Sequence, residues 1–151
     1  MIRVFCISDS DSHFSVPVET YLERLRGEVE LIRISPEKGS DPKMILRKET
    51  ERIRTTLAKY KSKPIYLDIG AKLYSTEEFF ESIERARNTI SDPDFLIGGA
   101  YGIDFESLRD ILSSSFSLSK MTFPHSLALL VLLEQLYRTS QIRKNTHYHH
   151  A

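Results

Sequence analysis

The stretch Phe95-Leu96-Ile97-Gly98-Gly99-Ala100-Tyr101-Gly102 decides the fold, because it joins a short apolar run directly to a cluster of glycines. An apolar run without alternating polar positions is typical of a strand buried on both faces, as in a parallel sheet. Ligands of open α/β sheets bind beyond the carboxyl ends of the strands, where glycine allows close backbone approach. The spacing fits neither a dinucleotide-binding nor a phosphate-binding loop. A ligand loop and a plain strand-to-helix turn both stay open at this point.

Outward from this stretch, strand patterns and helix patterns alternate. Further apolar runs occupy Ile2–Ile7, Val29–Ile34 and Ile65–Ile69. Between them, three segments show helical spacing: Val18, Tyr21, Leu22 and Leu25; Leu46, Ile53, Leu57 and Tyr60; and Thr76, Phe79, Phe80, Ile83 and Ile90. Ser75–Glu78 opens the third helix with the residues of a capping box. The alternation predicts an α/β fold with a mainly parallel sheet, in one domain over residues 1–151.

The last third of the chain predicts a helix of unusual composition. Residues Leu112–Ser119 are rich in serine and fit either a loop or a strand. Pro124 then begins a helix, which is apolar on nearly every side from Leu127 to Leu136. A helix without a polar face needs cover on two sides. The sheet covers one side, so we expect a second copy of the chain to cover the other in a homodimer.

The composition is that of a globular protein and excludes several classes. Hydrophobic residues make up 40% and charged residues 28% of the 151 residues, which excludes an intrinsically disordered chain. The single cysteine, Cys6, excludes an internal disulfide and a cysteine-based zinc site. No signal peptide is recognised, and the longest apolar run, Leu127–Leu133, is short of the ~20 residues of a membrane span. We therefore expect a cytoplasmic protein without a membrane segment.

The charge pattern is balanced overall but uneven along the chain. The net charge is zero, with 21 basic and 21 acidic residues, whereas RNA-binding proteins are usually basic. Basic residues outnumber acids between positions 41 and 63, and no acid follows Glu134. Either segment fits a solvated helix face as well as a contact with nucleic acid.

Two segments near the C-terminus are candidates for chemistry. Glu134 and Arg138 have the spacing of an intrahelical ion pair within an otherwise apolar helix. The loop Ser117–His125 precedes this helix, and its backbone N–H and C=O groups could bind the edge of an adenine. His125 fits equally a first-turn residue bonded to backbone. The histidine-rich tail 145–150 has no carboxylate or cysteine nearby, so we expect no metal site.

Three stretches together resemble a family of methyltransferases in the SPOUT superfamily, which modify N3 of a pseudouridine in large-subunit (23S) ribosomal RNA. The first comprises Leu67-Asp68-Ile69, Lys72 and Ser75–Phe79; the second comprises Phe95–Gly99 and Gly102; and the third runs through Ser117–His125 and Glu134–Arg138 to Tyr148-His149. The third stretch is long and specific, whereas residues 9–60 resemble the family only in pattern.

The resemblance implies a sheet with helices on both faces and a C-terminal trefoil knot, a rare exception among folds. It also implies S-adenosylmethionine as cofactor, bound in the knot without any metal. The residues that would hold it are Leu67, Gly98, Leu118, Ser119, Lys120, Met121, Thr122 and Phe123. Their loop amides and carbonyls would hold the adenine.

In this family two antiparallel subunits build each active site, and the tail of one reaches over the cofactor of the other. The resemblance therefore implies catalytic roles for Glu134, Arg138, Tyr148 and His149, with ribosomal RNA of the assembled ribosome as substrate. Arg138 would favour the deprotonated base, and His149 would accept its proton. Catalysis would otherwise come from positioning of the reacting atoms.

Three positions depart from the family by lacking a fixed positive charge: Ser8-Asp9-Ser10, Leu129 and His150. Such losses weaken contacts with phosphate groups. A second hypothesis is therefore a SPOUT-fold protein that binds the cofactor or RNA but has lost or altered methyl transfer. A third is an unrelated flavodoxin-like domain.

Overall fold

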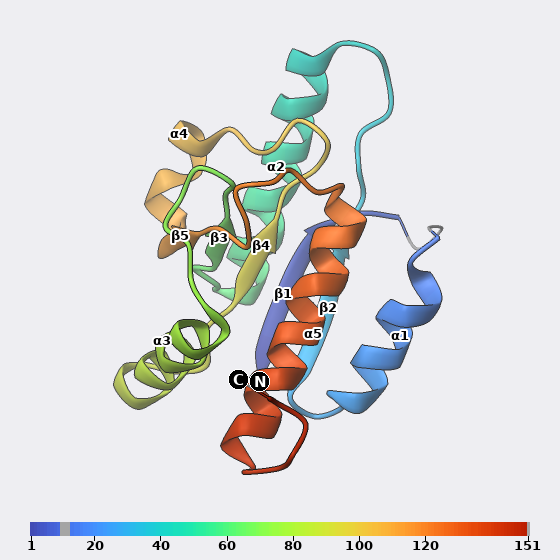
Figure 1. Ribbon diagram of the computed structural model, residues 1–151. Helices are drawn as coiled ribbons and strands as arrows, with labels where there is room; N and C mark the ends of the chain where they lie inside the picture. The colour runs from blue at the N-terminus through green and yellow to red at the C-terminus, as the bar shows by residue number, and fades with distance from the viewer. Residues whose placement is uncertain (10–12, 151) are drawn as a thin grey trace.

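The computed structural model describes residues 1–9 and 13–150 and contains one five-stranded sheet (Figure 1). The strands are β1 (Ile2–Ile7), β2 (Val29–Ile34), β3 (Ile65–Leu67), β4 (Phe95–Ile97) and β5 (Ser114–Phe116). Their order is β2-β1-β4-β3-β5, and every pairing is parallel. The predicted α/β class with a mainly parallel sheet is confirmed.

Helices cover both faces of this sheet, as expected. The helices are α1 (Ser15–Arg24), α2 (Pro42–Tyr60), α3 (Thr76–Thr89), α4 (Phe105–Leu108) and α5 (His125–Arg143), with a 3-10 turn at Arg109–Ile111. Side chains alternate along β1: Val4 and Cys6 join the core under α1, α3 and α5, whereas Phe5 and Ile7 join the core under α2 and α4. The fold therefore has three layers, with the sheet between α1, α3 and α5 on one face and α2 and α4 on the other.

Local chemistry sets the helix boundaries. The predicted capping box opens α3, because the Ser75 hydroxyl accepts the Glu78 N–H at 3.1 Å and the Glu78 carboxylate accepts the Ser75 N–H at 2.9 Å. One predicted stripe member is wrong: Ile90 is 87% exposed because α3 ends at Thr89. In α2 the predicted Leu46 is half-buried and its neighbour Ile45 is buried.

The C-terminal segment crosses the sheet. After β5 at the sheet edge, residues 117–124 return along the carboxyl ends of the strands, and α5 then lies over β1 between α1 and α3 (Figure 1). The Ser117 N–H donates to the Lys72 carbonyl at 2.8 Å, which places this segment against the loop after β3. The serine-rich stretch thus contains strand β5. The trefoil knot stays a prediction.

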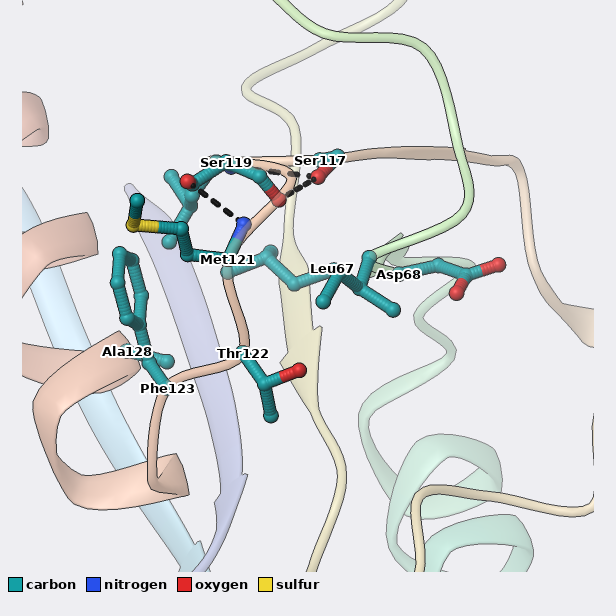
Figure 2. A pocket seen from close by; sticks show the side chains of 10 residues that line it. Leu67, Asp68, Ser117, Ser119, Met121, Thr122, Phe123 and Ala128 are labelled. Atoms are coloured by element: carbon teal, nitrogen blue, oxygen red, sulfur yellow. Dashed lines mark hydrogen bonds between the residues drawn. The ribbon is translucent and has the colours of Figure 1, made fainter.

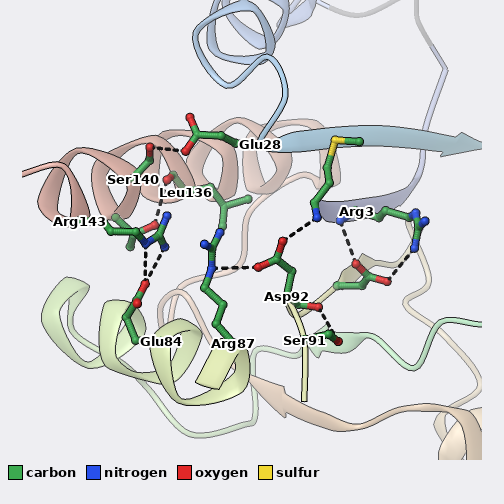
Figure 3. Close-up of polar contacts among 12 residues, drawn as sticks. Arg3, Glu28, Glu84, Arg87, Ser91, Asp92, Leu136, Ser140 and Arg143 are labelled. Carbon is green, nitrogen blue, oxygen red and sulfur yellow. Dashed lines mark hydrogen bonds and ion pairs between the residues drawn. The ribbon is translucent and has the colours of Figure 1, made fainter. Parts of the chain in front are cut away.

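A network of ion pairs lies beside the amino ends of the strands, at the end of the sheet that we call the amino edge (Figure 3). The opposite end, where the strands finish and the C-terminal segment returns, is the carboxyl edge. The Asp92 carboxylate contacts the Met1 ammonium at 2.6 Å and Arg87 Nε at 3.0 Å. Arg143 of α5 pairs with Glu84 of α3 at 2.7 Å, and Ser140 donates to Glu28 at 2.7 Å. These contacts tie α5 to α3 and to the segment before β2.

Candidate cofactor and active site

A pocket of about 120 Å³ opens at the carboxyl ends of β3 and β5 (Figure 2). Six of the eight residues that the sequence assigned to the cofactor line it: Leu67, Leu118, Ser119, Met121, Thr122 and Phe123. Pockets that enclose a drug-sized ligand have volumes of ~300–1,000 Å³. As one chain forms it, this pocket can therefore receive part of a nucleoside cofactor but does not enclose one.

Serine side chains hold the pocket loop in its irregular conformation. The Ser117 hydroxyl donates to the Ser119 carbonyl at 2.7 Å and accepts the Ser119 N–H at 3.2 Å. The Ser119 hydroxyl accepts the Met121 N–H at 3.0 Å (Figure 2). Such local bonds replace a regular ladder. They explain why this serine-rich segment could not be assigned to strand or loop from its composition.

Sequence reasoning missed three residues of the pocket wall, Asp68, Ile69 and Ala128, whereas Ser117 belongs to the loop that it proposed for the adenine. Asp68 supplies a carboxylate, whose Oδ1 accepts the Gly70 N–H at 3.2 Å, and it directly follows β3. Its place after a buried strand was a usable signal, because ligands bind beyond strand carboxyl ends. With the apolar side chains of Leu67, Leu118 and Phe123, the wall offers surface to an aromatic base, and Asp68 and the hydroxyls of Ser119 and Thr122 add polar groups to the lining (Figure 2).

The remaining two predicted cofactor residues lie elsewhere. Lys120 is exposed and Gly98 does not line the pocket. A Cβ on Gly98 would stand 3.0 Å from the Gly102 carbonyl group and from Ile103 Cγ2, so this glycine permits a tight turn. The plain strand-to-helix turn that the sequence left open is thus present, and a cofactor contact of Gly98 stays a prediction.

The four predicted catalytic residues form one cluster. Arg138 donates from Nε at 3.0 Å and from Nη2 at 2.6 Å to Oε1 of Glu134, its neighbour one turn away. The tail folds back onto α5, so that the Tyr148 hydroxyl donates to the same oxygen at 3.3 Å and Arg138 Nη1 lies 3.2 Å from His149 Nδ1. The Arg138 guanidinium lies 5.0 Å from the centre of the Tyr148 ring.

These contacts fix protons within the cluster. A guanidinium only donates, so Nδ1 of His149 accepts and the neutral ring carries its proton on Nε2, which lies 2.9 Å from Glu77 Oε1. The hydrogen bond to Glu134 raises the pKa of Arg138 above its ordinary value. Burial, with bonding to Tyr21 and the charge of Glu134, raises the pKa of Tyr148 to about 12. Arg138 therefore stays cationic and Tyr148 stays neutral.

The cluster and the pocket lie apart within one chain. Both use α5, but the pocket touches Ala128 in its first turns, whereas Arg138 follows ten residues later. At 1.5 Å per residue, roughly 15 Å of helix separates them. A single chain therefore does not bring these four side chains to its own pocket.

The positions that lack family cations have varied surroundings. Ser8 and Asp9 contact a different cation, because Arg33 Nη1 donates to the Ser8 hydroxyl at 2.8 Å and to the Asp9 carbonyl at 3.0 Å. Leu129 is 1% exposed in the core, and His150 is exposed. Ser10, the third residue of the first departure, lies outside the described residues, as does Ala151 at the end of the expected domain.

Within residues 1–9 and 13–150, no three His, Cys, Asp or Glu side chains stand together as metal ligands would. No helix in the same ranges has the length and apolarity for crossing a membrane.

Comparison with known proteins identifies the family. The model of the family described as "Predicted SPOUT methyltransferase" matches residues 1–149. Relatives named ribosomal RNA large subunit methyltransferase H include one from Mycoplasmopsis pulmonis, 32% identical over 98% of both chains. Another, from Bacillus thuringiensis, is 40% identical over 87% of both chains. A third, from Nitrosomonas eutropha, is 36% identical over 87% of this chain and 86% of its own.

The fold has a match among solved structures. A crystal structure of a Bacillus anthracis protein superposes with a TM-score of 0.58 at 14% identity, covering 93% of this chain and 95% of that chain. The family match rules out the unrelated flavodoxin-like domain. The matched family model spans the sheet, the pocket loop and the tail cluster alike, and the chain belongs to the SPOUT methyltransferase family.

Proposed function

We propose that this protein transfers a methyl group from S-adenosylmethionine to N3 of a pseudouridine in large-subunit ribosomal RNA. The observation that carries the proposal is the pocket beyond β3 and β5, which six residues assigned to the cofactor line together. The relatives' names support ribosomal RNA as the substrate. The pseudouridine and its N3 position come from the sequence resemblance.

The pocket residues suit an adenosine group. Leu67, Leu118 and Phe123 offer an apolar wall for the base, and the loop around Ser119 presents backbone groups to its polar edge. Asp68 could accept a bond from a ribose hydroxyl or the adenine amine. When bound, the cofactor supplies an electrophilic methyl group on a sulfonium.

A homodimer completes the site in this proposal. The side chains of α5 divide into a buried stripe, Leu129, Leu132, Leu133, Leu136, Thr139 and Ser140, and a half-buried stripe that turns away from the sheet. The half-buried stripe carries Leu127 and Val131 and, farther along, Glu134 and Arg138, whereas Leu130 packs against the core. Antiparallel packing of two such stripes would bring the tail cluster of one subunit to the pocket of the other, across the roughly 15 Å that separate them in one chain.

Arg138 is the principal catalytic group. The ring N3 of pseudouridine is a weakly acidic imide, so a nearby cation favours its anionic, nucleophilic form. The guanidinium has five N–H groups, of which Glu134 and His149 engage three, so two are available for a substrate oxygen. His149 would accept the imide proton once its Nδ1 exchanges Arg138 for the base.

Two measurements test this function. Calorimetry should detect binding of S-adenosylmethionine with a dissociation constant in the micromolar range, about −8 kcal/mol. Mass spectrometry of ribosomal RNA from a deletion strain should show the loss of one methylpseudouridine, which a plasmid copy of the gene restores.

The outcomes separate the rival hypotheses. Cofactor binding together with unchanged ribosomal RNA would favour a binding protein that has lost or altered methyl transfer. The three missing family cations and the zero net charge are the observations that favour this second candidate. Failure to bind the cofactor at millimolar concentration would overturn the methyltransferase and leave, of the second candidate, only the form that binds RNA.

A further inference from the structure

A buried carboxylate on α2 has no role in the chemistry described above. Glu49 is 3% exposed, and its Oε2 accepts the Glu37 backbone N–H at 3.0 Å. Its Oε1 is also buried and has no hydrogen-bond partner within the described ranges. A buried charged oxygen without a donor is costly, and such groups in native proteins call for an explanation.

The unpaired oxygen faces the glycine turn after β4. A Cβ built on Gly99 would stand 2.6 Å from Glu49 Oε1 and 3.0 Å from Ile7 Cγ2, so a larger residue here would displace the end of the Glu49 side chain and press against Ile7. Within the turn, the Gly99 carbonyl accepts the Gly102 N–H at 3.0 Å, and Gly102 has φ of 73°. The Glu49 carboxylate therefore packs directly against the backbone of Gly99, because glycine has no side chain to separate the two.

The next residue of α2 contacts the other end of the same turn. Thr50 is 6% exposed, and its hydroxyl accepts the Asp104 N–H at 3.4 Å. Two adjacent buried polar residues of α2 thus contact the segment from Gly99 to Asp104. This arrangement couples the turn to α2, on the sheet face opposite α5.

The turn also borders the pocket edge of the sheet. β3 and β4 pair in parallel with Tyr66 opposite Leu96, so that the next residues, Leu67 and Ile97, end the two strands side by side. The glycines that follow Ile97 therefore leave the sheet beside Leu67 and Asp68 of the pocket wall. No residue of the turn lines the pocket itself, so an effect of the turn on the pocket would pass through Leu67 and Asp68.

We propose that Glu49 is a positioning residue for the cofactor: its charged Oε1 sets the conformation of the Gly98–Gly102 turn, and the turn sets the pocket. This inference rests on the proposed function. It explains why an unpaired charge persists in the core, since strained or unsatisfied groups are retained where they serve a site rather than the fold.

The substitution Glu49→Gln isolates the charge. Its amide oxygen can still accept the Glu37 N–H, while an NH₂ group replaces the oxygen beside Gly99. We expect the dissociation constant for S-adenosylmethionine to rise about ten-fold, because the NH₂ group beside Gly99 would displace the turn. The melting temperature should stay within roughly 3 °C or rise, because an unpaired buried charge is removed. Glu51→Gln, two residues along on the exposed side of α2, is the matched control.

A size exchange tests the contact itself. Gly99→Ala should lower cofactor affinity by at least about ten-fold, because its methyl group meets the carboxylate. Adding Glu49→Asp withdraws the carboxylate by one methylene and should restore part of the affinity. The amide NMR signals of Gly98, Gly99 and Gly102 should move in ligand-free Glu49→Gln and stay in place in Glu51→Gln.

The results distinguish this inference from the function on which it rests. A wild-type protein that binds no cofactor overturns both. Normal cofactor binding by Glu49→Gln alongside binding by the wild type, or an equal loss of affinity in Glu51→Gln, overturns the positioning role alone. A weaker affinity in step with a large fall in melting temperature would likewise make Glu49 merely structural.

Discussion

The two edges of the sheet differ in how their side chains are held. At the amino edge, Asp92, Glu84 and Glu28 each pair with a cation or a hydroxyl from another element (Figure 3). At the carboxyl edge, the Asp68 carboxylate of the pocket wall accepts a local bond from Gly70, and Met121 is 75% exposed. The amino edge therefore joins α5 to α3 and to the segment before β2, whereas the pocket wall keeps the side chains of Asp68 and Met121 accessible to a ligand.

Two arginines of α5 test this division most strongly. Arg138→Ala should lower methyl transfer by roughly 10²–10⁴-fold, the range of a positioned acid, base or charge in catalysis, with little change in cofactor affinity. Arg143→Ala, five residues along, removes the ion pair with Glu84 at the amino edge. The Arg143→Ala variant should have a lower free energy of unfolding and an unchanged rate of methyl transfer. Single-turnover assays and calorimetry on both variants measure the difference.

Mixed dimers show which subunit the tail serves. A chain truncated before Tyr148 and a Leu118→Asp chain should each be inactive as homodimers. A heterodimer pairs the intact pocket of the first with the intact tail of the second and should recover part of the activity. Verified heterodimers without any activity would show that the tail acts within its own subunit.

The half-buried stripe of α5 gives the next largest effect. Val131→Glu places a charge on the side of the helix away from the sheet, and we expect dimer association to weaken by about 10²-fold or more, the cost of an unpaired charge in an interface. Sedimentation at nanomolar to micromolar concentrations measures it. Gln141→Glu, on the same side near the helix end, is a milder control. A wild-type protein that is monomeric throughout this range would contradict the dimer.

The pocket wall gives a smaller effect on cofactor affinity. Phe123→Ala removes part of an aromatic wall and should weaken S-adenosylmethionine binding roughly ten-fold, as expected for the loss of a partly buried apolar surface. Phe105→Ala, an exposed ring on α4, should leave the affinity unchanged. A Phe123→Ala variant that binds the cofactor as tightly as Phe105→Ala and the wild type would exclude Phe123 from the site.

Sequence patterns predicted the layers and most of the pocket, and failed where geometry across elements decides. The continuous apolar runs around Val4 and Phe95 indicate strands that are buried on both faces, so the parallel sheet was predictable. The residues Leu118–Phe123 followed from a specific local resemblance. A neighbour of the Gly99 turn, by contrast, is Glu49, fifty positions earlier on helix α2, and no local sequence pattern predicts such a contact.

The amino edge supplies the smallest effect, through its dependence on pH. Burial tends to raise the pKa of Asp92, but the Met1 ammonium and Arg87 outweigh it and hold that pKa below its ordinary value. Glu28 behaves alike, because bonds from Ser140 and Lys144 outweigh its burial. A lowered pKa in the folded state means that the unfolded chain binds more protons in acid. These carboxylates therefore stabilise the fold fully above their unfolded pKa values, about 3.9 and 4.3, and lose that contribution as the pH falls below them.

The double variant Asp92→Asn with Glu28→Gln measures this contribution. At pH 7 it should lower the free energy of unfolding by about 1–2 kcal/mol in urea titrations, as expected for a few partly exposed charged hydrogen bonds. At pH 3 the difference from wild type should be smaller, since these carboxylates are then largely protonated in the unfolded chain and their lowered pKa in the fold no longer contributes in full. Protein concentration is held fixed, because unfolding of a dimer depends on it. A constant difference between pH 3 and pH 7 would mean that packing, rather than charge, joins the layers at the amino edge.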